Sequence, residues 1–402
     1  MKNTKMPAIR FKGFNDDWEQ RKLDDVAEYR NGKAHENEID DDGEYIVVNS
    51  KFVSTNGEIK KFSNAQNEPL YENEIAFVLS DVPNGRAIAR TFLIDKSGKY
   101  TLNQRIAGIT PYEDTDPYYL HIKMNRNAYF LKFDDGNKQT NLSIKDVLNY
   151  EDMYPNYKEQ QKIGNYFRSL DHLITLHQRK LEKIKLMKKS MLGKMFPKDA
   201  ESIPKIRFNR YTDDWEQRKW MNSVDISTEM VDPASGEYDD MPHIAPGNIE
   251  SFTGRILDNV RTVKEEQLIS GKFRFRPDDV VYGKINPQLG KYFYASVDGL
   301  TSADAYVFKG KNGIRQKFLF SMLQTSDFFK YSVSVSKRSG MPKINRDELN
   351  AYAFLAPSEE EQDKIGNFLL EIDHLITLHQ RKLEKLKKAK KSLLEHMFPM
   401  EK

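Results

Sequence analysis

Two blocks of this sequence occur twice, once in each half of the chain. The first block comprises Pro7, residues 9–11 (IRF) and residues 16–22 (DDWEQRK), and it recurs at an offset of 197 as Pro204, residues 206–208 and residues 213–219. The second block, residues 171–183, returns unchanged at residues 373–385, an offset of 202. Self-similarity of this kind indicates a duplicated structural unit, so we expect two copies of one fold.

The segments between the shared blocks differ strongly. Residues 23–150 and 220–352 share few identities, although short fragments keep their order, as where residues 57–59 match residues 254–256. A fixed frame with one changed segment per half is typical of two readers on one scaffold, because the changed surface is where partner choice resides. The alternative is neutral drift after duplication, but drift would not spare the repeated blocks so selectively.

The divergent segments contain short runs of β-forming residues. Examples are residues 45–48, 75–79, 280–282 and 305–308, which stand among Gly, Asn and Pro turns. We predict an α+β protein in which two similar mixed α/β domains are joined by two long antiparallel coiled-coil helices, with a pseudo-twofold internal repeat. The predicted boundaries are 1–158 for the first domain, 159–196 for the first spacer helix, 197–357 for the second domain and 358–402 for the second spacer helix.

A heptad seam runs through the repeated helical block. It extends from Ile163 to Met195 with alternating steps of four and three, and it recurs from residue 365 to residue 397. We predict antiparallel packing in which paired seam positions sum to 560, so that His177 faces Leu383 and Leu181 faces His379. The two histidines could indicate a metal or catalytic site, but a histidine inside a seam is usually a polar group that sets the register.

Composition excludes several classes of protein. The 402 residues predict two or three compact domains, and 38% hydrophobic with 31% charged residues describes a soluble protein. No apolar run approaches the roughly 20 residues that span a bilayer, and the first ten residues hold no signal sequence, so we expect a cytoplasmic location. The absence of cysteine excludes disulfides, thiol nucleophiles and thiolate metal sites. The net charge of +3 says little about a polyanionic partner, because only its distribution would matter.

Signatures of catalysis are missing from the sequence. We find no phosphate loop for ATP and no glycine-rich turn for a dinucleotide. Residues 286–289 (NPQL) lack the second proline and the aromatic residue of the signature found in adenine methyltransferases. Acidic pairs such as residues 16–17 and 278–279 are more typical of turns and caps than of a metal site. We therefore predict a protein that is not an enzyme, holds no metal and binds no cofactor of its own.

Three features of the chain occur together: the repeated DDWEQRK blocks, the helix starts Glu159-Gln160 and Glu361-Gln362, and the plan of two domains and two helices. In these features the chain resembles the specificity subunits of Type I restriction-modification systems, over essentially its whole length. The resemblance implies that each domain is a target-recognition domain for one half of a bipartite, asymmetric sequence in double-stranded DNA. It also implies that the helices separate the domains and bind two methyltransferase subunits, which are joined by motor-nuclease subunits. S-adenosylmethionine, ATP and magnesium would then be held by these partners.

Two other functions stay open. The chain could be a coiled-coil adaptor that never touches nucleic acid, or the recognition half of a modification enzyme that works without Type I partners. Absence of duplex binding would favour the adaptor, and methyl transfer or ATP consumption by the chain alone would favour the modification enzyme.

Candidate DNA-binding residues lie at turns beside the β-type runs, where basic side chains suit phosphates and amides suit base edges. In the first domain they are Lys51, Asn84, Arg86, Arg90, Asn103, Gln104 and Arg105. In the second domain they are Asn248, which aligns with Lys51 at the 197 offset, and Lys284, Asn286, Gln288, Lys291, Lys337, Arg338 and Lys343. Residues 336–343 are expected to form a basic loop suited to phosphate.

Overall fold

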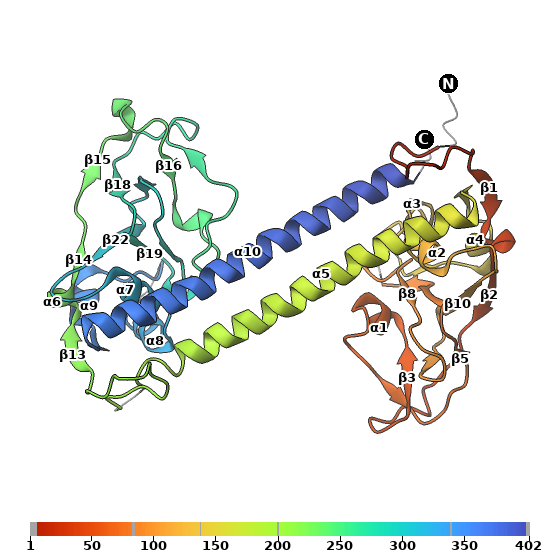
Figure 1. Ribbon diagram of the computed structural model, residues 1–402, viewed down its shortest axis with the longest axis horizontal. Coiled ribbons are helices and arrows are strands. Elements are labelled where there is room, and N and C mark those ends of the chain that lie inside the picture. The colour runs from red at the N-terminus through yellow and green to blue at the C-terminus, as the bar shows by residue number, and fades with distance from the viewer. Residues whose placement is uncertain (1–5, 83–84, 137, 199–200, 338–339, 399–402) are drawn as a thin grey trace. The chain divides into compact units, whose positions relative to one another are not determined.

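The computed structural model describes residues 6–82, 85–136, 138–198, 201–337 and 340–398 (Figure 1). The chain forms two compact units. Unit 1 comprises Met1–Thr175 with Glu384–Lys402, and unit 2 comprises Leu176–Leu383. No helix of the described ranges is long and apolar enough to cross a membrane.

Unit 1 is built on two four-stranded sheets. The first is antiparallel in the order β2 (Ala27–Asn31), β10 (Ile106–Pro111), β6 (Ile75–Val78) and β8 (Thr91–Leu93). The second has the order β4 (Phe62–Ser63), β3 (Tyr45–Val48), β9 (Tyr100–Leu102) and β5 (Pro69–Leu70), and its β3–β9 pair is parallel. The remaining elements are the pairs β1 (Glu19–Lys22) with β12 (Glu151–Tyr154) and β7 (Ser80–Asp81) with β11 (Thr140–Asn141), the turn η1 (Leu23–Asp25), and the helices α1 (Ser50–Ser54), α2 (Pro117–Met124), α3 (Ala128–Leu131) and α4 (Ile144–Leu148).

Strand β6 is apolar at every position because both of its faces are buried. All four of its side chains are fully buried. Successive side chains of a strand point to opposite faces, and here Ile75 and Phe77 join the cluster that contains helix α2, whereas Ala76 and Val78 join the cluster between the two sheets. The strand is therefore covered on both faces.

Unit 2 repeats this arrangement. Its antiparallel sheet has the order β14 (Val224–Ile226), β22 (Ala305–Gly310), β19 (Val280–Gly283) and β20 (Tyr292–Tyr294), and its second sheet has the order β15 (Met230–Val231), β18 (Lys272–Phe275), β21 (Gly299–Thr301), β16 (Pro242–His243) and β17 (Arg261–Thr262). The pair β16–β21 is parallel, as β3–β9 is in unit 1. The remaining elements are the pair β13 (Glu216–Lys219) with β23 (Ala353–Ala356), the turns η2 (Pro233–Ser235), η3 (Pro246–Asn248) and η4 (Pro287–Leu289), and the helices α6 (Trp220–Ser223), α7 (Gln316–Met322), α8 (Ser326–Val335) and α9 (Arg346–Ala351).

Each unit also contains parts of two long helices, α5 (Tyr157–Leu192) and α10 (Glu359–Met397), which run side by side (Figure 1). In unit 1, Lys390 Nζ binds Asp171 Oδ1 at 2.6 Å, and Met397 packs in the same cluster as Ile163. In unit 2, Lys188 binds Asp373, the same residue types with their helices exchanged. The helices are therefore antiparallel in each unit, and the predicted α+β fold with two similar domains and two long helices is confirmed.

The contact between the two seam histidines corrects the predicted pairing in unit 2. His177 Nδ1 and His379 Nδ1 lie 3.0 Å apart, whereas the register placed Leu383 opposite His177. A seam residue enters a hole formed by four residues of the facing helix, so it reaches a residue one turn from the position directly opposite. Burial, followed by nearby lysines, lowers the pKa of His177, and this favours two neutral rings that share one hydrogen bond.

Repeated frame residues attach α5 and α10 to the two units. In unit 1, Arg10 donates from Nε and Nη2 to the two carboxylate oxygens of Glu159, each at 2.7 Å. In unit 2, Arg207 donates to Glu361 in the same way, each at 2.8 Å. Both carboxylates are completely buried. The same geometry in both units gives the repeated blocks a structural role, which is to fix the start of each long helix.

The glutamine after each of these glutamates makes a second attachment. Gln160 accepts a hydrogen bond from the amide of Asp116, the residue that caps α2, at 3.0 Å. Gln362 accepts one from the amide of Arg315, the residue before α7, also at 3.0 Å. Asp116 and Arg315 are thus equivalent positions of the two units.

Candidate nucleic-acid interface

Several of the predicted DNA-binding residues lie at the same end of equivalent sheets in the two units. In unit 1, Arg86 and Arg90 lie on the connection between β6 and β8. In unit 2, Lys284, Asn286 and Gln288 lie on the connection between β19 and β20, the equivalent strands. We call residues 79–82, 85–90 and 103–105 of unit 1, and residues 284–291 and 340–344 of unit 2, the reading loops.

Backbone hydrogen bonds join the reading loops of unit 1. The amide of Leu79 donates to the carbonyl of Arg105 at 3.0 Å, which links the β6–β8 connection to the turn after β9. The amide of Asn103 donates to Val48 at 3.1 Å, and Lys51 follows Val48 in the first turn of α1. The predicted side chains of this unit therefore come from neighbouring turns of the fold.

Backbone hydrogen bonds also join the reading loops of unit 2, between the β19–β20 connection and the segment that follows α8. The amide of Asn286 donates to the carbonyl of Pro342 at 2.8 Å, and the amide of Ile344 donates to Lys284 at 3.1 Å. Ile285 and Lys343 form an isolated β-bridge. Lys284, Asn286 and Lys343, which are far apart in sequence, are thus brought together.

Positive charge concentrates on these loops. In unit 1, burial and then the charges of Arg126 and Arg86 lower the pKa of Arg90. Arg126 Nη1 donates to the carbonyl of Ile88 at 3.2 Å, so it lies against the same loop. Among the residues that the structure describes, none of these three arginines forms an ion pair. The one carboxylate on the reading loops of unit 1, Asp81, accepts from the amides of Ala87 and Ile88. The arginines therefore leave an excess of positive charge, which favours a polyanionic partner.

Unit 2 has a comparable basic cluster around Tyr306. Lys284 Nζ lies 5.0 Å from the centre of this ring, and the Arg346 guanidinium lies 5.8 Å from it. Burial is the main cause that lowers the pKa of Lys284, with further contributions from Lys343 and Arg346, whereas Asp304 opposes them. The cluster is therefore positive, although less uniformly so than the three arginines of unit 1.

The exposed candidates are Lys51, Arg86, Gln104, Arg105, Gln288, Lys337 and Lys343, and the half-buried ones are Arg90, Asn103, Lys284, Asn286 and Lys291. Asn84 and Arg338 lie outside the described residues. The Gln104 amide already donates to Glu36 Oε1 at 2.8 Å. These assignments stay predictions, because their evidence is placement and charge.

Two candidates of unit 2 make side-chain hydrogen bonds inside the protein. Asn248 is 8% exposed, and its side chain accepts from the amide of Ala245 at 2.9 Å and donates to Asn259 Oδ1 at 3.2 Å. Lys291 donates to the carbonyl of Ile249. Alignment with Lys51 suggested a DNA contact for Asn248. Its buried amide is hydrogen-bonded inside the protein, and its assignment stays a prediction.

Sequence reasoning missed Arg126 and Arg346. Arg126 follows α2, and its amide donates to the carbonyl of Ala89 at 2.8 Å. Arg346 opens α9 and donates to the carbonyls of Ile226 and Ser227. Neither residue stands beside a β-type run in the sequence, so only the tertiary contact reveals that each belongs with the basic cluster.

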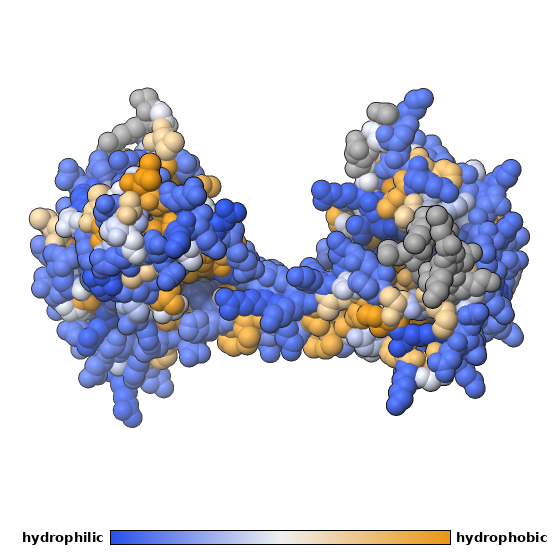
Figure 2. Space-filling model, turned by 90° about the horizontal axis from the view of Figure 1, so that it is seen from above, coloured by the Kyte–Doolittle hydropathy of each residue, from blue (hydrophilic) through white to orange (hydrophobic). Residues whose placement is uncertain are grey.

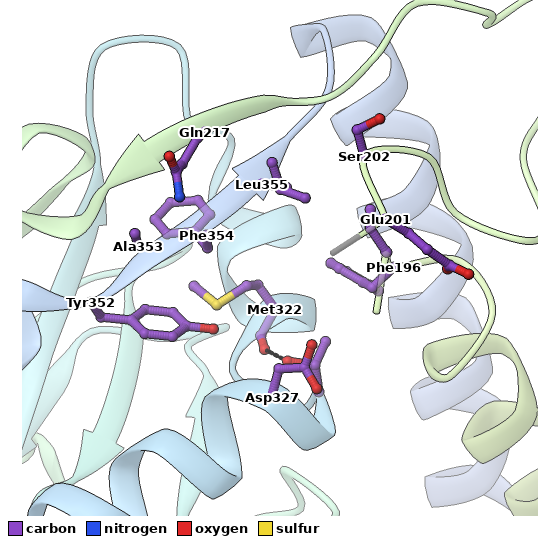
Figure 3. A pocket seen from close by; sticks show the side chains of 12 residues that line it. Phe196, Glu201, Ser202, Gln217, Met322, Asp327, Tyr352, Ala353, Phe354 and Leu355 are labelled. Atoms are coloured by element: carbon purple, nitrogen blue, oxygen red, sulfur yellow. Dashed lines mark hydrogen bonds between the residues drawn. The ribbon is translucent and has the colours of Figure 1, made fainter. Parts of the chain in front are cut away.

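A cavity of about 440 Å³ lies elsewhere in unit 2 (Figure 3). Its lining is mixed: Phe196, Met322 and Phe354 line it together with Glu201, Gln217 and Asp327. Groups of three or more His, Asp or Glu side chains placed to hold a metal ion do not occur within the described ranges. The reading loops, rather than this cavity, are the candidate functional site.

Comparison with known proteins agrees with this architecture. Residues 15–186 and 228–388 match the family model described as Type I restriction modification DNA specificity domain. The Type I restriction enzyme EcoDI specificity subunit of Escherichia coli is 30% identical over 42% of this chain, and this alignment spans 38% of that subunit. The MjaVIII specificity subunit of Methanocaldococcus jannaschii is 24% identical, over 94% of this chain and 91% of that subunit. The crystal structure of the Type I restriction-modification S subunit from M. genitalium has the same fold, with a TM-score of 0.70 at 14% identity, and the match covers 99% of this chain and 100% of that one.

Proposed function

This chain belongs to the family of Type I restriction modification DNA specificity domains and carries two such domains, and from that premise we propose that it is the non-catalytic subunit that reads DNA sequence in a Type I restriction-modification complex. Each unit reads one half of a bipartite, asymmetric target in double-stranded DNA. The observation that carries this proposal is that equivalent connections of the two similar units, β6–β8 and β19–β20, bear different side chains: arginines in unit 1, and lysine and amide residues in unit 2. One fold thereby presents two reading surfaces.

The adaptor and the self-sufficient modification enzyme are less well supported. A coiled-coil adaptor gives no reason for like charges to gather on the reading loops of both units. A modification enzyme would need a cofactor site in this chain, whereas we propose that S-adenosylmethionine, ATP and magnesium are held by partner subunits. The complex would act in the cytoplasm, where its DNA substrate is found.

Alanine replacement of Asn103, Gln104 and Arg105 together is expected to relax one half of the target and to spare the other. These side chains lie on one turn of unit 1, and loss of a bidentate base contact costs about 1–3 kcal/mol of discrimination. The measurement is binding of the assembled methyltransferase to duplexes that are randomised in one half-site at a time, across a salt series.

Two lysine variants distinguish loss of base reading from loss of phosphate binding. Lys343→Ala should weaken binding to all sequences and flatten the salt dependence by about one unit of slope, as for a lost phosphate contact. Lys96→Ala should change neither the affinity nor the salt dependence. Lys96 is also exposed, but it lies on the turn after β8, whereas Arg90 lies directly before β8, at the opposite end of the strand. Equal loss of selectivity in both half-sites of the triple variant would contradict the assignment of one unit to one half-site.

The long helices carry a second seam, which fits the proposed docking of methyltransferase subunits. On α5, positions 166, 169, 173, 176, 180, 183 and 187 repeat the steps of three and four, and they include Tyr166, Leu173, Leu176 and Met187, which are all exposed. On α10, Leu375 and Leu378 are exposed at equivalent positions. Hydrophobic side chains are visible on the helices among hydrophilic ones (Figure 2). A seam of this spacing suits a helix of a partner, and we assign it to the methyltransferase subunits, to which motor-nuclease subunits are added.

Replacing Leu176 and Leu378 with glutamate should weaken binding of methyltransferase subunits by about ten-fold or more, because charges would enter the apolar part of the interface. The two side chains are 51% and 60% exposed, so the isolated chain should keep its stability. Native mass spectrometry of the mixed subunits measures the effect. Leu186→Glu is the control, since Leu186 is 67% exposed but lies off both seams; if it were equally damaging, the second seam would not be the docking surface.

A further inference from the structure

Two exposed apolar side chains interrupt the polar reading loops of unit 2. Leu289 is 44% exposed and Met341 is 69% exposed. They lie on separate loops that the Asn286 to Pro342 backbone bond and the Ile285–Lys343 bridge hold together. Gln288 precedes Leu289, and Lys343 follows Met341 by two residues, so this surface combines apolar groups with hydrogen-bonding and positively charged ones.

The loop that carries Leu289 is held in a defined conformation. Turn η4 (Pro287–Leu289) is flanked by Asn286 at φ 51° and Gly290 at φ 54°, both left-handed, and Pro287 is buried. A Cβ atom on Gly290 would lie 2.5 Å from the ring of Phe252, so glycine is required there. The amide of Phe252 also donates to the carbonyl of Gly290 at 2.8 Å. Leu289 is therefore presented on a short turn that is already ordered, which lowers the entropy cost of binding.

The chemistry of the major groove suggests what these side chains meet. Among the groups that base pairs present there, the C5-methyl group of thymine is the apolar one, and side chains recognise it by van der Waals contact. Asn286 and Gln288, on the same turn, have amides of the type that binds adenine, and Gln288 Nε2 donates to Asn286 Oδ1 at 3.2 Å. Apolar and amide groups at one site therefore both favour an A·T pair.

Resting on the proposed function, we infer that Leu289 and Met341 contact the 5-methyl group of a thymine in the half-site read by unit 2. Unit 2 then selects at least one A·T pair by apolar contact. Lys284 and Lys343 supply attraction to phosphate beside that contact. The inference is confined to unit 2, because the reading loops of unit 1 combine one exposed apolar residue, Val82, with arginines.

The test replaces single thymines of the target duplex with uracil, which removes only the methyl group. Once the target is known, the assembled methyltransferase is titrated with each substituted duplex. Binding should weaken about four-fold at one or two positions of the unit 2 half-site, which corresponds to about 0.8 kcal/mol for one buried methyl group. Uracil in the spacer between half-sites should have no effect.

Variants connect this effect to the two side chains. The double variant Leu289→Ala/Met341→Ala should bind thymine and uracil duplexes equally, whereas Ile269→Ala, at a residue of the same unit that is 86% exposed, should keep the difference. The inference is overturned if the unit 2 half-site has only G·C pairs, if every uracil substitution is neutral, or if the double variant still discriminates. Failure of the unmodified complex to select any duplex would instead overturn the proposed function.

Discussion

Replacing Glu361 with alanine is expected to lower the free energy of unfolding of unit 2 by about 3–5 kcal/mol. The Glu361 side chain is fully buried, and it accepts both hydrogen bonds of the Arg207 guanidinium at 2.8 Å. Arg207 is itself only 12% exposed, and its Nη1 is buried without another partner. Removal of the carboxylate would leave a buried charge uncompensated, which costs far more than an exposed ion pair contributes.

A neighbouring glutamate of the same helix turn provides the control. Glu359 pairs with Arg315 at 2.8 Å, but the two side chains are 52% and 49% exposed. Exposed pairs contribute about 0–1 kcal/mol, so Glu359→Ala should have a small effect. Urea unfolding, with amide hydrogen exchange to follow the strands of unit 2, measures both variants, and equal losses would contradict the role given to burial. Glu159→Ala should have the same large effect on unit 1, where Arg10 is the partner.

Local sequence patterns predicted the elements of the fold. The apolar runs at 75–79 and 280–282 coincide with β6 and β19, the central strands that each unit covers on both faces. The repeated seam predicted two long helices that pack on each other, because heptad spacing follows from helix geometry. Their antiparallel direction was predicted separately, from the fact that each helix leaves its own copy of the duplicated domain. The strands and the seam depend on residues that are close in sequence, so they need no knowledge of tertiary contacts.

The reading surface was less predictable because it depends on how loops turn. Lys51 and Asn248 align at one offset, yet Lys51 is exposed after β3 whereas Asn248 folds its amide towards Asn259 after the shorter strand β16. Arg126 joins Arg86 and Arg90 only through a contact between the end of α2 and the loop before β8. Side-chain direction in a loop follows from these bonds, and they leave no periodic signal in the sequence.

A buried ion pair distinguishes unit 1 from unit 2. Lys123, whose side chain is 1% exposed, binds Asp152 Oδ2 at 2.9 Å and donates to the carbonyl of Met153 at 2.9 Å. Asp116 and Arg315 are equivalent positions, and Lys123 and Met322 each follow them by the same number of residues. Lys123 therefore corresponds to Met322 in unit 2. Asp152 corresponds to Phe354, since each pairs with the arginine of its DDWEQRK block. Unit 2 therefore has apolar side chains where unit 1 has a charge pair.

This difference predicts a large loss of stability for one change in unit 1 and a small change for another. Asp152→Ala should lower the free energy of unfolding by about 3–5 kcal/mol, because it leaves the Lys123 ammonium buried without its carboxylate. The double variant Lys123→Met/Asp152→Phe should have a free energy of unfolding within about 2 kcal/mol of the original chain, since replacing a buried pair by apolar groups is often neutral. The remaining loss comes from the hydrogen bonds that Asp152 accepts from Tyr150 and Met153. Urea unfolding of both variants provides the comparison. A double variant as unstable as Asp152→Ala would show that the aspartate acts through those other bonds, and not by compensating the charge of Lys123.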